Sequence, residues 1–289
     1  MTLLLFCFIV VSGTSVDRWK DGYRCDPVPS KLQKPQRNVV ALRQAHAHND
    51  YLHKRPLLDA LANGFTSVEA DIFLVNGKLL VAHTRREIKQ SRTLEALYLA
   101  PLRKHIRQQK GQVYPTGEQL LLLIDIKNNG EATYKVLHKL LAQYADIVTK
   151  FTPKQTIRKP VLVVISGARP RDYMLNQKVR YAGYDGRVSD LKSDLPPSFM
   201  PLISDSWYSH FLWFGKGPMP AKMKQRLAEI VKLAHAKGRR VRFWATYDLP
   251  TPRRENIWRE LLRANVDLIN TDDLEGLRRF LLSRKKVER

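Results

Sequence analysis

Cysteine and acidic residues are scarce in this chain. Its 289 residues include two cysteines, Cys7 and Cys25, too few for a disulfide framework or a cysteine-based metal site. Aspartate and glutamate number 27 against 50 lysines and arginines, so the formal net charge is +23. This imbalance predicts a positive surface potential that attracts anions, among them phosphate-bearing molecules and anionic lipid headgroups.

Three kinds of sequence signal are also missing. There is no glycine-rich fingerprint of a dinucleotide-binding fold, and no basic run with interleaved aromatic residues of the kind that binds nucleic acid. Beyond residue 15, no segment is long and apolar enough to be transmembrane. We therefore expect no specific nucleic-acid partner and no transmembrane segment in the mature chain.

The first 15 residues, MTLLLFCFIVVSGTS, form a short apolar run that ends in small residues. This pattern predicts a signal peptide over residues 1–15 and a secreted or periplasmic protein, although no Lys or Arg precedes the apolar run. A buried N-terminal strand is the alternative. Residues 16–38 are polar, contain three prolines and are predicted to form an N-terminal extension.

Strand and helix signals alternate from residue 39 to residue 282, and residues 283–289 form a charged tail. Alternation indicates parallel βαβ units, and roughly eight strands over about 245 residues fit a (β/α)8 barrel of the α/β class. A doubly wound open sheet is the alternative. Strands are predicted at residues 39–42, 66–73, 78–82, 119–126, 160–166, 201–204, 240–246 and 266–270. Helices are predicted at residues 56–63, 94–109 with a break at Pro101, 131–145, 221–237, 255–264 and 274–282.

Two carboxylates stand two residues apart on the strand predicted at residues 66–73. Side chains at i and i+2 of a strand point to the same face, so Glu69 and Asp71 project together. Ala70 and Ile72 give the other face an apolar character, which favours an inward-facing pair at a barrel mouth over a solvated edge strand. Paired carboxylates repel each other, so they favour a bound cation, and oxygen ligands suit Mg2+ or Ca2+.

Histidines lie at the ends of the two flanking strands. His46 and His48 follow the first predicted strand, beside Asn49 and Asp50, and His83 follows the third. A single histidine is more often structural than catalytic. Two histidines at strand ends beside an acidic pair instead favour a functional site.

The apolar strand LLLLIDIK carries a second pair of charged residues, Asp125 and Lys127, again two residues apart. Such an unbroken apolar run is typical of a central strand that is buried on both faces. Asp125 offers a third carboxylate for a cation, and Lys127 offers a positive charge for an anionic substrate. A simple ion pair between the two is the alternative.

Taken together, His48, the Glu69-x-Asp71 pair, His83 and Asp125-x-Lys127 resemble the glycerophosphodiester phosphodiesterase and phosphatidylinositol-specific phospholipase C superfamily. The HNDY stretch and SVEADIFLVNGKLLVAH are most similar to the branch that includes the fungal altered-inheritance-of-mitochondria phosphodiesterase-like proteins. The resemblance covers about residues 39 to 280. It implies a distorted TIM barrel of the phospholipase-C-like phosphodiesterase type over residues 39–282.

The resemblance also implies roles for individual residues. Glu69, Asp71 and Asp125 match the ligands of one divalent cation, Mg2+ or Ca2+. His48 and His83 match the catalytic histidine pair, and Lys127 matches the lysine that contacts the substrate phosphate. His46, two residues before His48, is the alternative to it.

Two further residues are candidates for substrate binding. Asn49 follows His48 where ordinary glycerophosphodiesterases have Arg, so a phosphate-contacting arginine is missing and the substrate class does not carry over. Trp244 stands where relatives have an aromatic residue that walls the mouth of the site, with a core aromatic as the alternative.

These residues predict a metal-dependent phosphoric diester hydrolase that acts on a glycerophosphodiester or phospholipid-type substrate by acid–base catalysis from two histidines. The alternative is a barrel that binds anionic phospholipid headgroups or polyanions without turnover. The basic composition also suggests peripheral contact with an anionic membrane surface.

Overall fold

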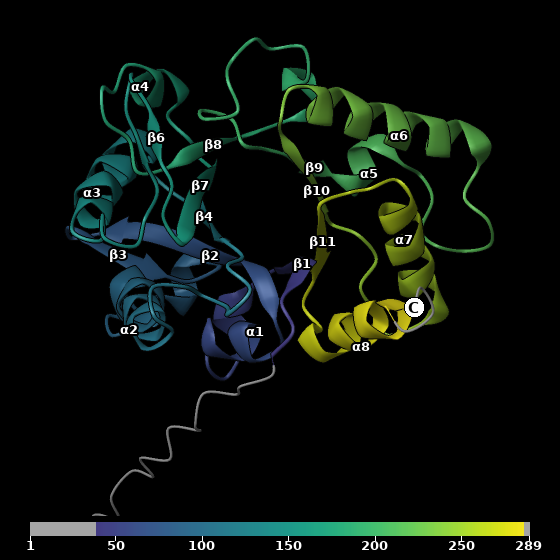
Figure 1. The fold of residues 1–289 in the computed structure, drawn as a ribbon, viewed down its shortest axis with the longest axis horizontal. Helices are drawn as coiled ribbons and strands as arrows, with labels where there is room; N and C mark the ends of the chain where they lie inside the picture. Colours follow the sequence, from purple (N-terminus) through teal and green to yellow (C-terminus); the bar gives the residue numbers. More distant parts are fainter. Residues whose placement is uncertain (1–38, 286–289) are drawn as a thin grey trace, which may run out of the picture. The chain divides into compact units, whose positions relative to one another are not determined.

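Eight parallel strands close into a barrel in the computed structural model, which describes residues 39–285 (Figure 1). The strands follow one another around the ring in the order β1-β11-β10-β9-β8-β7-β4-β2, and pairing of β1 with β2 closes it. The predicted TIM barrel is thus confirmed. Its strands are β1 (Leu42–Ala47), β2 (Phe65–Val75), β4 (Leu120–Ile126), β7 (Val161–Gly167), β8 (Gly183–Gly186), β9 (Leu202–Ser206), β10 (Arg240–Trp244) and β11 (Leu268–Thr271).

Helices and short hairpins surround this ring on its outer side (Figure 1). The helices are α1 (Leu58–Ala62), α2 (Ala100–Gln108), α3 (Gly130–Ala142), α4 (Arg171–Leu175), α5 (Trp207–His210), α6 (Ala221–Ala236), α7 (Pro252–Arg263) and α8 (Leu274–Lys285). Single turns are η1 (Asp50–Leu52), η2 (Arg85–Glu87), the π-helical η3 (Glu95–Leu99) and η4 (Val188–Asp190). Outside the barrel, β3 (Lys78–Val81) pairs antiparallel with β2, and β5 (Lys150–Phe151) pairs with β6 (Thr156–Ile157).

Two of the predicted strands differ from the barrel strands in ways that matter for the site. The first strand covers residues 42–47 rather than 39–42, so His46 lies within β1. The strand predicted at residues 78–82 is present as β3, but it is a hairpin partner of β2 and lies outside the ring. The eighth barrel strand is β8, whose sequence GYDG contains residues that are depleted in strands and gave no strand signal.

The break predicted at Pro101 does not occur. The π-helical turn η3 runs directly into α2, and Pro101 occupies the first turn of α2. Proline is tolerated there because the first backbone N–H groups of a helix have no intrahelical acceptor.

The ends of the chain lie partly outside the described residues. The predicted signal peptide (residues 1–15) and extension (residues 16–38) belong to this undescribed part, as do residues 286–289. Helix α8, predicted at residues 274–282, continues to Lys285 and so extends three residues into the predicted charged tail. Among residues 39–285, no helix combines the length and the apolar character needed to cross a bilayer.

The barrel interior changes from apolar to polar along its strands. Leu121 and Leu123 of β4 are fully buried and pack with Val164 of β7 in one interior cluster. The next residue of β4 on this inward face is Asp125, since successive side chains of a strand alternate. The C-terminal end of the barrel is therefore the polar end, where TIM barrels place their chemistry.

The N-terminal end of the barrel is hollowed by a separate cavity of about 990 Å³, whose lining includes Arg43, His235 and Arg240. It lies at the opposite end of the strands from Asp125. Because conserved chemistry in this fold belongs to the C-terminal end, this cavity is not the candidate site.

Candidate active site

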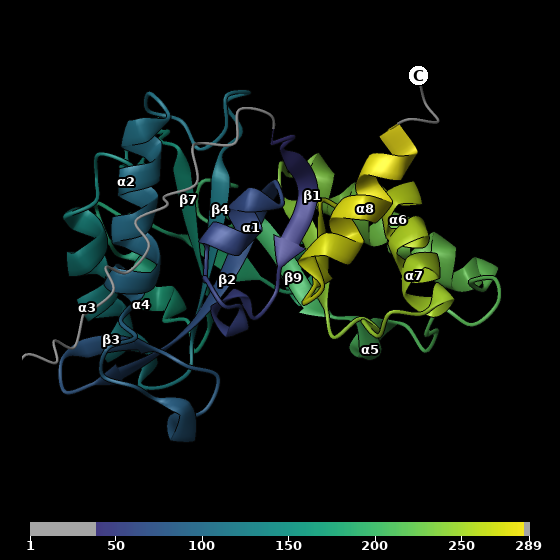
Figure 2. The same cartoon turned by 90° about the horizontal axis from the view of Figure 1, so that it is seen from below.

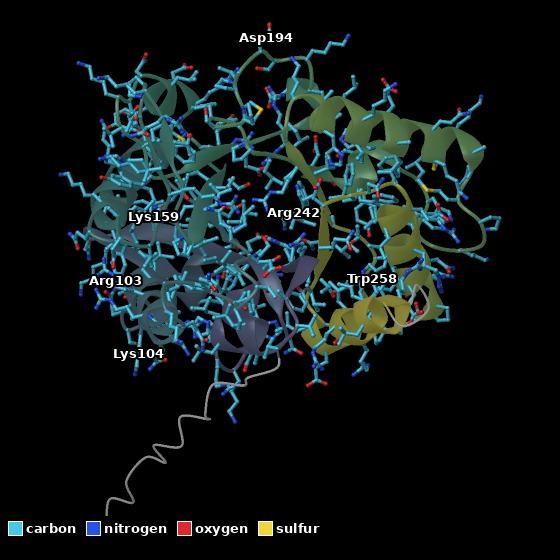
Figure 3. The ribbon with its side chains drawn as sticks, viewed as in Figure 1. Arg103, Lys104, Lys159, Asp194, Arg242 and Trp258 are labelled. Atoms are coloured by element: carbon cyan, nitrogen blue, oxygen red, sulfur yellow. The ribbon has the colours of Figure 1, made fainter. Side chains whose placement is uncertain are left out.

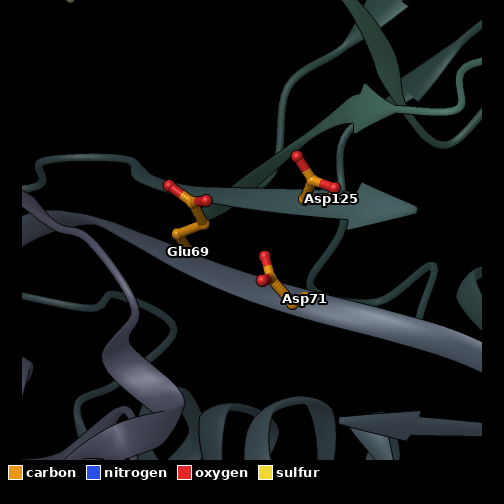
Figure 4. A group of neighbouring side chains, drawn as sticks. All are labelled: Glu69, Asp71 and Asp125. Atoms are coloured by element: carbon orange, nitrogen blue, oxygen red, sulfur yellow. The ribbon is translucent and has the colours of Figure 1, made fainter. Parts of the chain in front are cut away.

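Three carboxylates meet at the C-terminal end of the barrel. Glu69 and Asp71 lie on β2, and Asp125 lies opposite Asp71 on the neighbouring strand β4 (Figure 4). One carboxylate oxygen from each residue lies within 4.8 Å of the others. The juxtaposition predicted from the i, i+2 spacing is therefore present, and it extends to the third carboxylate.

The electrostatics of these carboxylates favour a cation. Burial and the charge of Glu69 raise the pKa of Asp71 above its usual range. Burial also raises the pKa of Asp125 to about 6 against the opposing charge of Lys127, with Asp71 and Glu69 adding to the rise. Asp71 Oδ1 is buried and has no hydrogen-bond partner among residues 39–285. An oxygen-rich set with an unpartnered buried oxygen fits a hard divalent cation.

Lys127 reaches into the same cluster. Its Nζ lies 2.8 Å from Asp71 Oδ2 and 3.2 Å from Asp125 Oδ1. The ion pair considered from the sequence is thus present, and Lys127 contacts a second carboxylate as well.

His83 faces the acidic cluster from the segment that follows β3. Its Nδ1 lies 3.0 Å from Asp71 Oδ2, while its side chain is 55% exposed. Its Nε2 has no partner within the described part of the chain. A carboxylate on Nδ1 and an accessible Nε2 are the arrangement required of a histidine that exchanges protons with a bound molecule.

His48 has the same arrangement on the other side of the mouth. Its Nδ1 lies 2.7 Å from Asp272 Oδ1, and its side chain is 27% exposed. Burial alone would lower the pKa of His48, but the hydrogen bond with Asp272 and the charge of Glu69 outweigh it, so the pKa is raised. Nε2 of His48 likewise has no partner among residues 39–285.

His46 occupies a deeper position on β1 and is fully buried. Its Nδ1 lies 2.7 Å from Ser67 Oγ, and its Nε2 lies 3.2 Å from Glu69 Oε2. Burial, with help from the charge of Arg242, lowers the pKa of His46 to about 3. A neutral imidazole with both nitrogens engaged orients Glu69, so the geometry favours His48 over His46 as the histidine that meets the substrate.

Asn49 and Trp244 lie at the mouth. Asn49 adopts a left-handed backbone conformation, with a φ of 47°, and accepts a hydrogen bond of 2.6 Å from the Tyr51 hydroxyl through Oδ1. Its Nδ2 lies 3.0 Å from His48 Nδ1. Trp244, the last residue of β10, is 37% exposed and is therefore not a core aromatic.

Tyr51 was not predicted, although it belongs to the HNDY stretch. Its hydroxyl lies 2.7 Å from Asp71 Oδ2 and 3.0 Å from His83 Nδ1. Burial and the nearby carboxylates raise the pKa of Tyr51, so the hydroxyl stays protonated and ties the turn after β1 to β2.

Arg242 is a second residue that sequence reasoning missed. It lies near the barrel axis (Figure 3), is buried, and donates through Nη2 to Glu69 Oε2. Its Nε donates to Asn270 Oδ1 at 2.9 Å. Burial alone would raise the pKa of Glu69, but the charge of Arg242 and the hydrogen bond with His46 together hold this pKa well below its usual range. A basic residue in the middle of the strand sequence RVRFW was the available signal.

Asp272 lies between the end of β11 and the start of α8. The cap is provided by Asp273, whose Oδ1 accepts a hydrogen bond of 2.9 Å from the Gly276 backbone N–H. Asp272 contacts His48 instead. Its own backbone N–H donates to Asp248 Oδ2 at 2.7 Å, which fixes its position beside the histidine.

Because Gly167 has no side chain, the Asp125 carboxylate has room beside it. Its φ is +68°, and a Cβ at this position would lie 2.4 Å from Asp125 Oδ1 and 2.5 Å from the Ile126 carbonyl oxygen. A larger residue would therefore displace both a carboxylate of the site and the backbone of β4.

Asp50 secures the turn that carries the mouth residues. Its Oδ2 accepts hydrogen bonds from the Leu57 backbone N–H at 2.6 Å and from the Tyr98 hydroxyl at 2.9 Å, while Oδ1 has no partner among residues 39–285. Burial raises the pKa of Asp50 from 3.8 to about 6, because the two hydrogen bonds offset its cost only in part.

Replacing Asp50 with asparagine is expected to remove a pH-dependent loss of stability. A carboxyl with a raised folded-state pKa stabilises the fold fully below the unfolded value of 3.8, and this stability is lost as pH rises through about 6. The unfolding free energy of the wild type relative to Asp50→Asn should therefore fall by about 2 kcal/mol between pH 4 and pH 7. Urea unfolding of both proteins at several pH values measures this difference, and parallel pH profiles would contradict it.

Comparison with known proteins places the chain in a family. Residues 33–185 match the AIM6-like phosphodiesterase domain, and residues 240–275 match the glycerophosphoryl diester phosphodiesterase family. The chain is 33% identical to altered inheritance of mitochondria protein 6 of Eremothecium gossypii, over 89% of this chain and 74% of that protein. It is 29% identical to the altered inheritance of mitochondria protein 6 homolog of Arthroderma benhamiae, over 84% of this chain and 85% of that protein.

The crystal structure of a glycerophosphoryl diester phosphodiesterase from Parabacteroides distasonis has a similar fold, with a TM-score of 0.51 over 84% of this chain and 87% of that chain. At 14% sequence identity, this similarity concerns the barrel alone. The match over residues 33–185 spans more than half of the 289 residues. The chain therefore belongs to the AIM6-like phosphodiesterase domain family, the branch that its motifs resemble.

Proposed function

We propose that this protein is a metal-dependent phosphoric diester hydrolase that acts on a glycerophosphodiester or phospholipid-type substrate. The observation that carries the proposal is the convergence of Glu69, Asp71 and Asp125 at the barrel mouth, beside Lys127 and between two accessible histidines. Carboxylates, ammonium and imidazole are the groups that a phosphodiester cleavage requires.

One divalent cation, Mg2+ or Ca2+, would be held by Glu69, Asp71 and Asp125. When bound, such a cation neutralises a non-bridging phosphate oxygen and stabilises the charge that develops there in the transition state. Lys127 supplies a second positive charge from the protein itself, so both non-bridging oxygens are compensated.

The two histidines move the protons. His48 accepts the proton of the attacking hydroxyl, from water or from the substrate, at Nε2, while Asp272 holds the proton on Nδ1 and so sets the tautomer. The bond from phosphorus to the leaving oxygen breaks, and His83 donates its Nε2 proton to the departing alkoxide. Asp71 Oδ2 lies 3.0 Å from His83 Nδ1 and so orients the ring, with Nε2 left for the leaving group.

Turnover of a phosphodiester panel tests this proposal. Purified protein should hydrolyse at least one glycerophosphodiester or phosphatidyl lipid with Mg2+ or Ca2+, and EDTA should abolish the activity. Product analysis separates a cyclic phosphate, a phosphomonoester and a released alcohol. Headgroup binding that persists in EDTA, without turnover of any diester, would instead support the non-catalytic barrel.

We also propose that the protein is secreted or periplasmic. It depends on residues 1–15, which lie outside the described part of the chain.

A further inference from the structure

Exposed apolar side chains gather at the end of the barrel that carries the acidic cluster. Ten large apolar side chains are exposed among residues 39–285, and six of them end or follow β1, β9 or β10. Since β9, β10, β11 and β1 are neighbours in the ring, these segments form one arc of the mouth. This apolar rim consists of Leu52, Tyr208, Leu212, Phe214, Trp244 and Leu249.

Half of the apolar rim lies on one segment that is fixed by buried aromatic residues. In the segment after β9, Trp207, Phe211 and Trp213 are buried, and each is followed directly by an exposed residue, Tyr208, Leu212 and Phe214. Trp207 Nε1 donates to the Trp213 carbonyl at 2.8 Å. The segment is therefore fixed with alternate side chains facing outward, and Leu212 is 76% exposed.

The loop after β10 and the turn after β1 complete the arc. Leu249 is 62% exposed and Leu52 is 67% exposed. Leu52 follows Tyr51 in the same turn, so the apolar rim begins one residue from a side chain that contacts Asp71. Figure 2 shows β1 running toward the side of the barrel on which α5 lies.

Basic residues accompany the apolar rim. Lys54, Lys216 and Arg253 are exposed on the same three segments. Arg85, Arg86 and Lys89 are exposed in the loop that starts at His83. Among the acidic groups of these segments, Asp272 contacts His48 and Asp248 accepts a hydrogen bond from Thr271. Glu87, in the same loop as Arg85, accepts from the backbone N–H groups of His83 and Thr84. Exposed apolar side chains among basic side chains of uncompensated charge suit the surface of an anionic bilayer. At such a surface the apolar side chains insert and the lysines contact the headgroups.

We infer that the apolar rim docks on the surface of an anionic lipid bilayer, which places headgroups directly in front of the acidic cluster. The docking itself follows from the arrangement of the apolar rim and the basic residues. That the docked lipid supplies the phosphodiester rests on the proposed function.

Co-sedimentation of the full chain with vesicles tests the docking. Vesicles of phosphatidylcholine mixed with phosphatidylserine should bind the protein, and phosphatidylcholine alone should bind it much more weakly. The double variant Leu212→Ser/Leu249→Ser should lower partitioning about tenfold or more, because two apolar tips no longer insert. Lys216→Gln should lower it roughly fivefold.

Matched controls come from α6, outside the rim, where Leu233 and Lys232 are exposed. Leu233→Ser and Lys232→Gln should bind vesicles as the wild type does. Equal vesicle binding by the rim variants and the α6 variants would overturn docking by the apolar rim. So would vesicle binding that falls in Lys216→Gln but not in Leu212→Ser/Leu249→Ser.

Hydrolysis of a water-soluble diester separates this inference from the proposed function. The rim variants should retain wild-type turnover of a soluble diester and lose turnover of vesicle lipid. Rim-dependent vesicle binding without any turnover supports docking while the proposed function fails. Turnover of soluble diesters without vesicle binding overturns docking while the proposed function stands.

Discussion

Asp71→Asn is expected to lower kcat/KM for a phosphodiester by about a thousandfold, without destabilising the fold. Asp71 accepts contacts from Tyr51, His83 and Lys127, all within 3.0 Å, and it is one of the three carboxylates proposed to hold the cation. Asparagine preserves the shape and an acceptor oxygen but removes one negative charge. The loss therefore falls on cation binding and on the positioning of His83.

The stability of this variant distinguishes a functional role from a structural one. Burial and Glu69 raise the pKa of Asp71, so its ionised form is disfavoured in the fold. In EDTA, the melting temperature of Asp71→Asn should equal or exceed that of the wild type. Added Mg2+ or Ca2+ should raise the wild-type melting temperature and raise that of the variant much less, since a ligand stabilises only the state that binds it.

A matched control for Asp71→Asn is Asp59→Asn, which removes the carboxylate of an outer ion pair with Arg55. Surface ion pairs contribute little to stability, and Asp59 lies away from the acidic cluster, so activity and cation response should be unchanged. Full activity in Asp71→Asn would show that the cation site has been placed wrongly.

The acidic cluster could be predicted because it depends on local periodicity. Glu69 and Asp71 lie on β2, Asp125 lies on β4, and Lys127 follows β4 directly. The alternation of these strands is readable in the sequence, and their parallel register brings the charged residues together. The barrel was predictable for the same reason. Most of its strands are runs of apolar residues, and such runs predict strands. The sequence GYDG of β8 carries no such signal.

The supporting contacts of the site could not be predicted, because they join residues far apart in the chain. His48 and Asp272 are separated by 224 positions, and Glu69 and Arg242 by 173. Closure of the ring through β1, β11 and β10 is what brings these pairs together. From the sequence alone, Asp272 resembles a helix-capping residue. Arg242 is then one of many basic residues in a chain of net charge +23.

His83→Gln is expected to lower kcat for an alkyl phosphodiester by about a thousandfold and for a nitrophenyl phosphodiester by less than about tenfold. An alkoxide is a poor leaving group and needs the proton of a general acid, whereas nitrophenolate departs without one. His48→Gln should lower kcat on both substrates by about a thousandfold, because the attacking hydroxyl needs a base whatever the leaving group.

His235→Gln provides the matched control for both histidine variants. His235 Nε2 lies 2.8 Å from Asp267 Oδ2, so it is also a histidine–carboxylate pair, but it lies at the N-terminal end of the barrel. His235→Gln should have the wild-type kcat for both substrates. If His48→Gln rather than His83→Gln were rescued by the nitrophenyl substrate, the roles of acid and base would be exchanged. Equal losses on both substrates in both variants would contradict a division of labour between the two histidines, since only the acid depends on the leaving group.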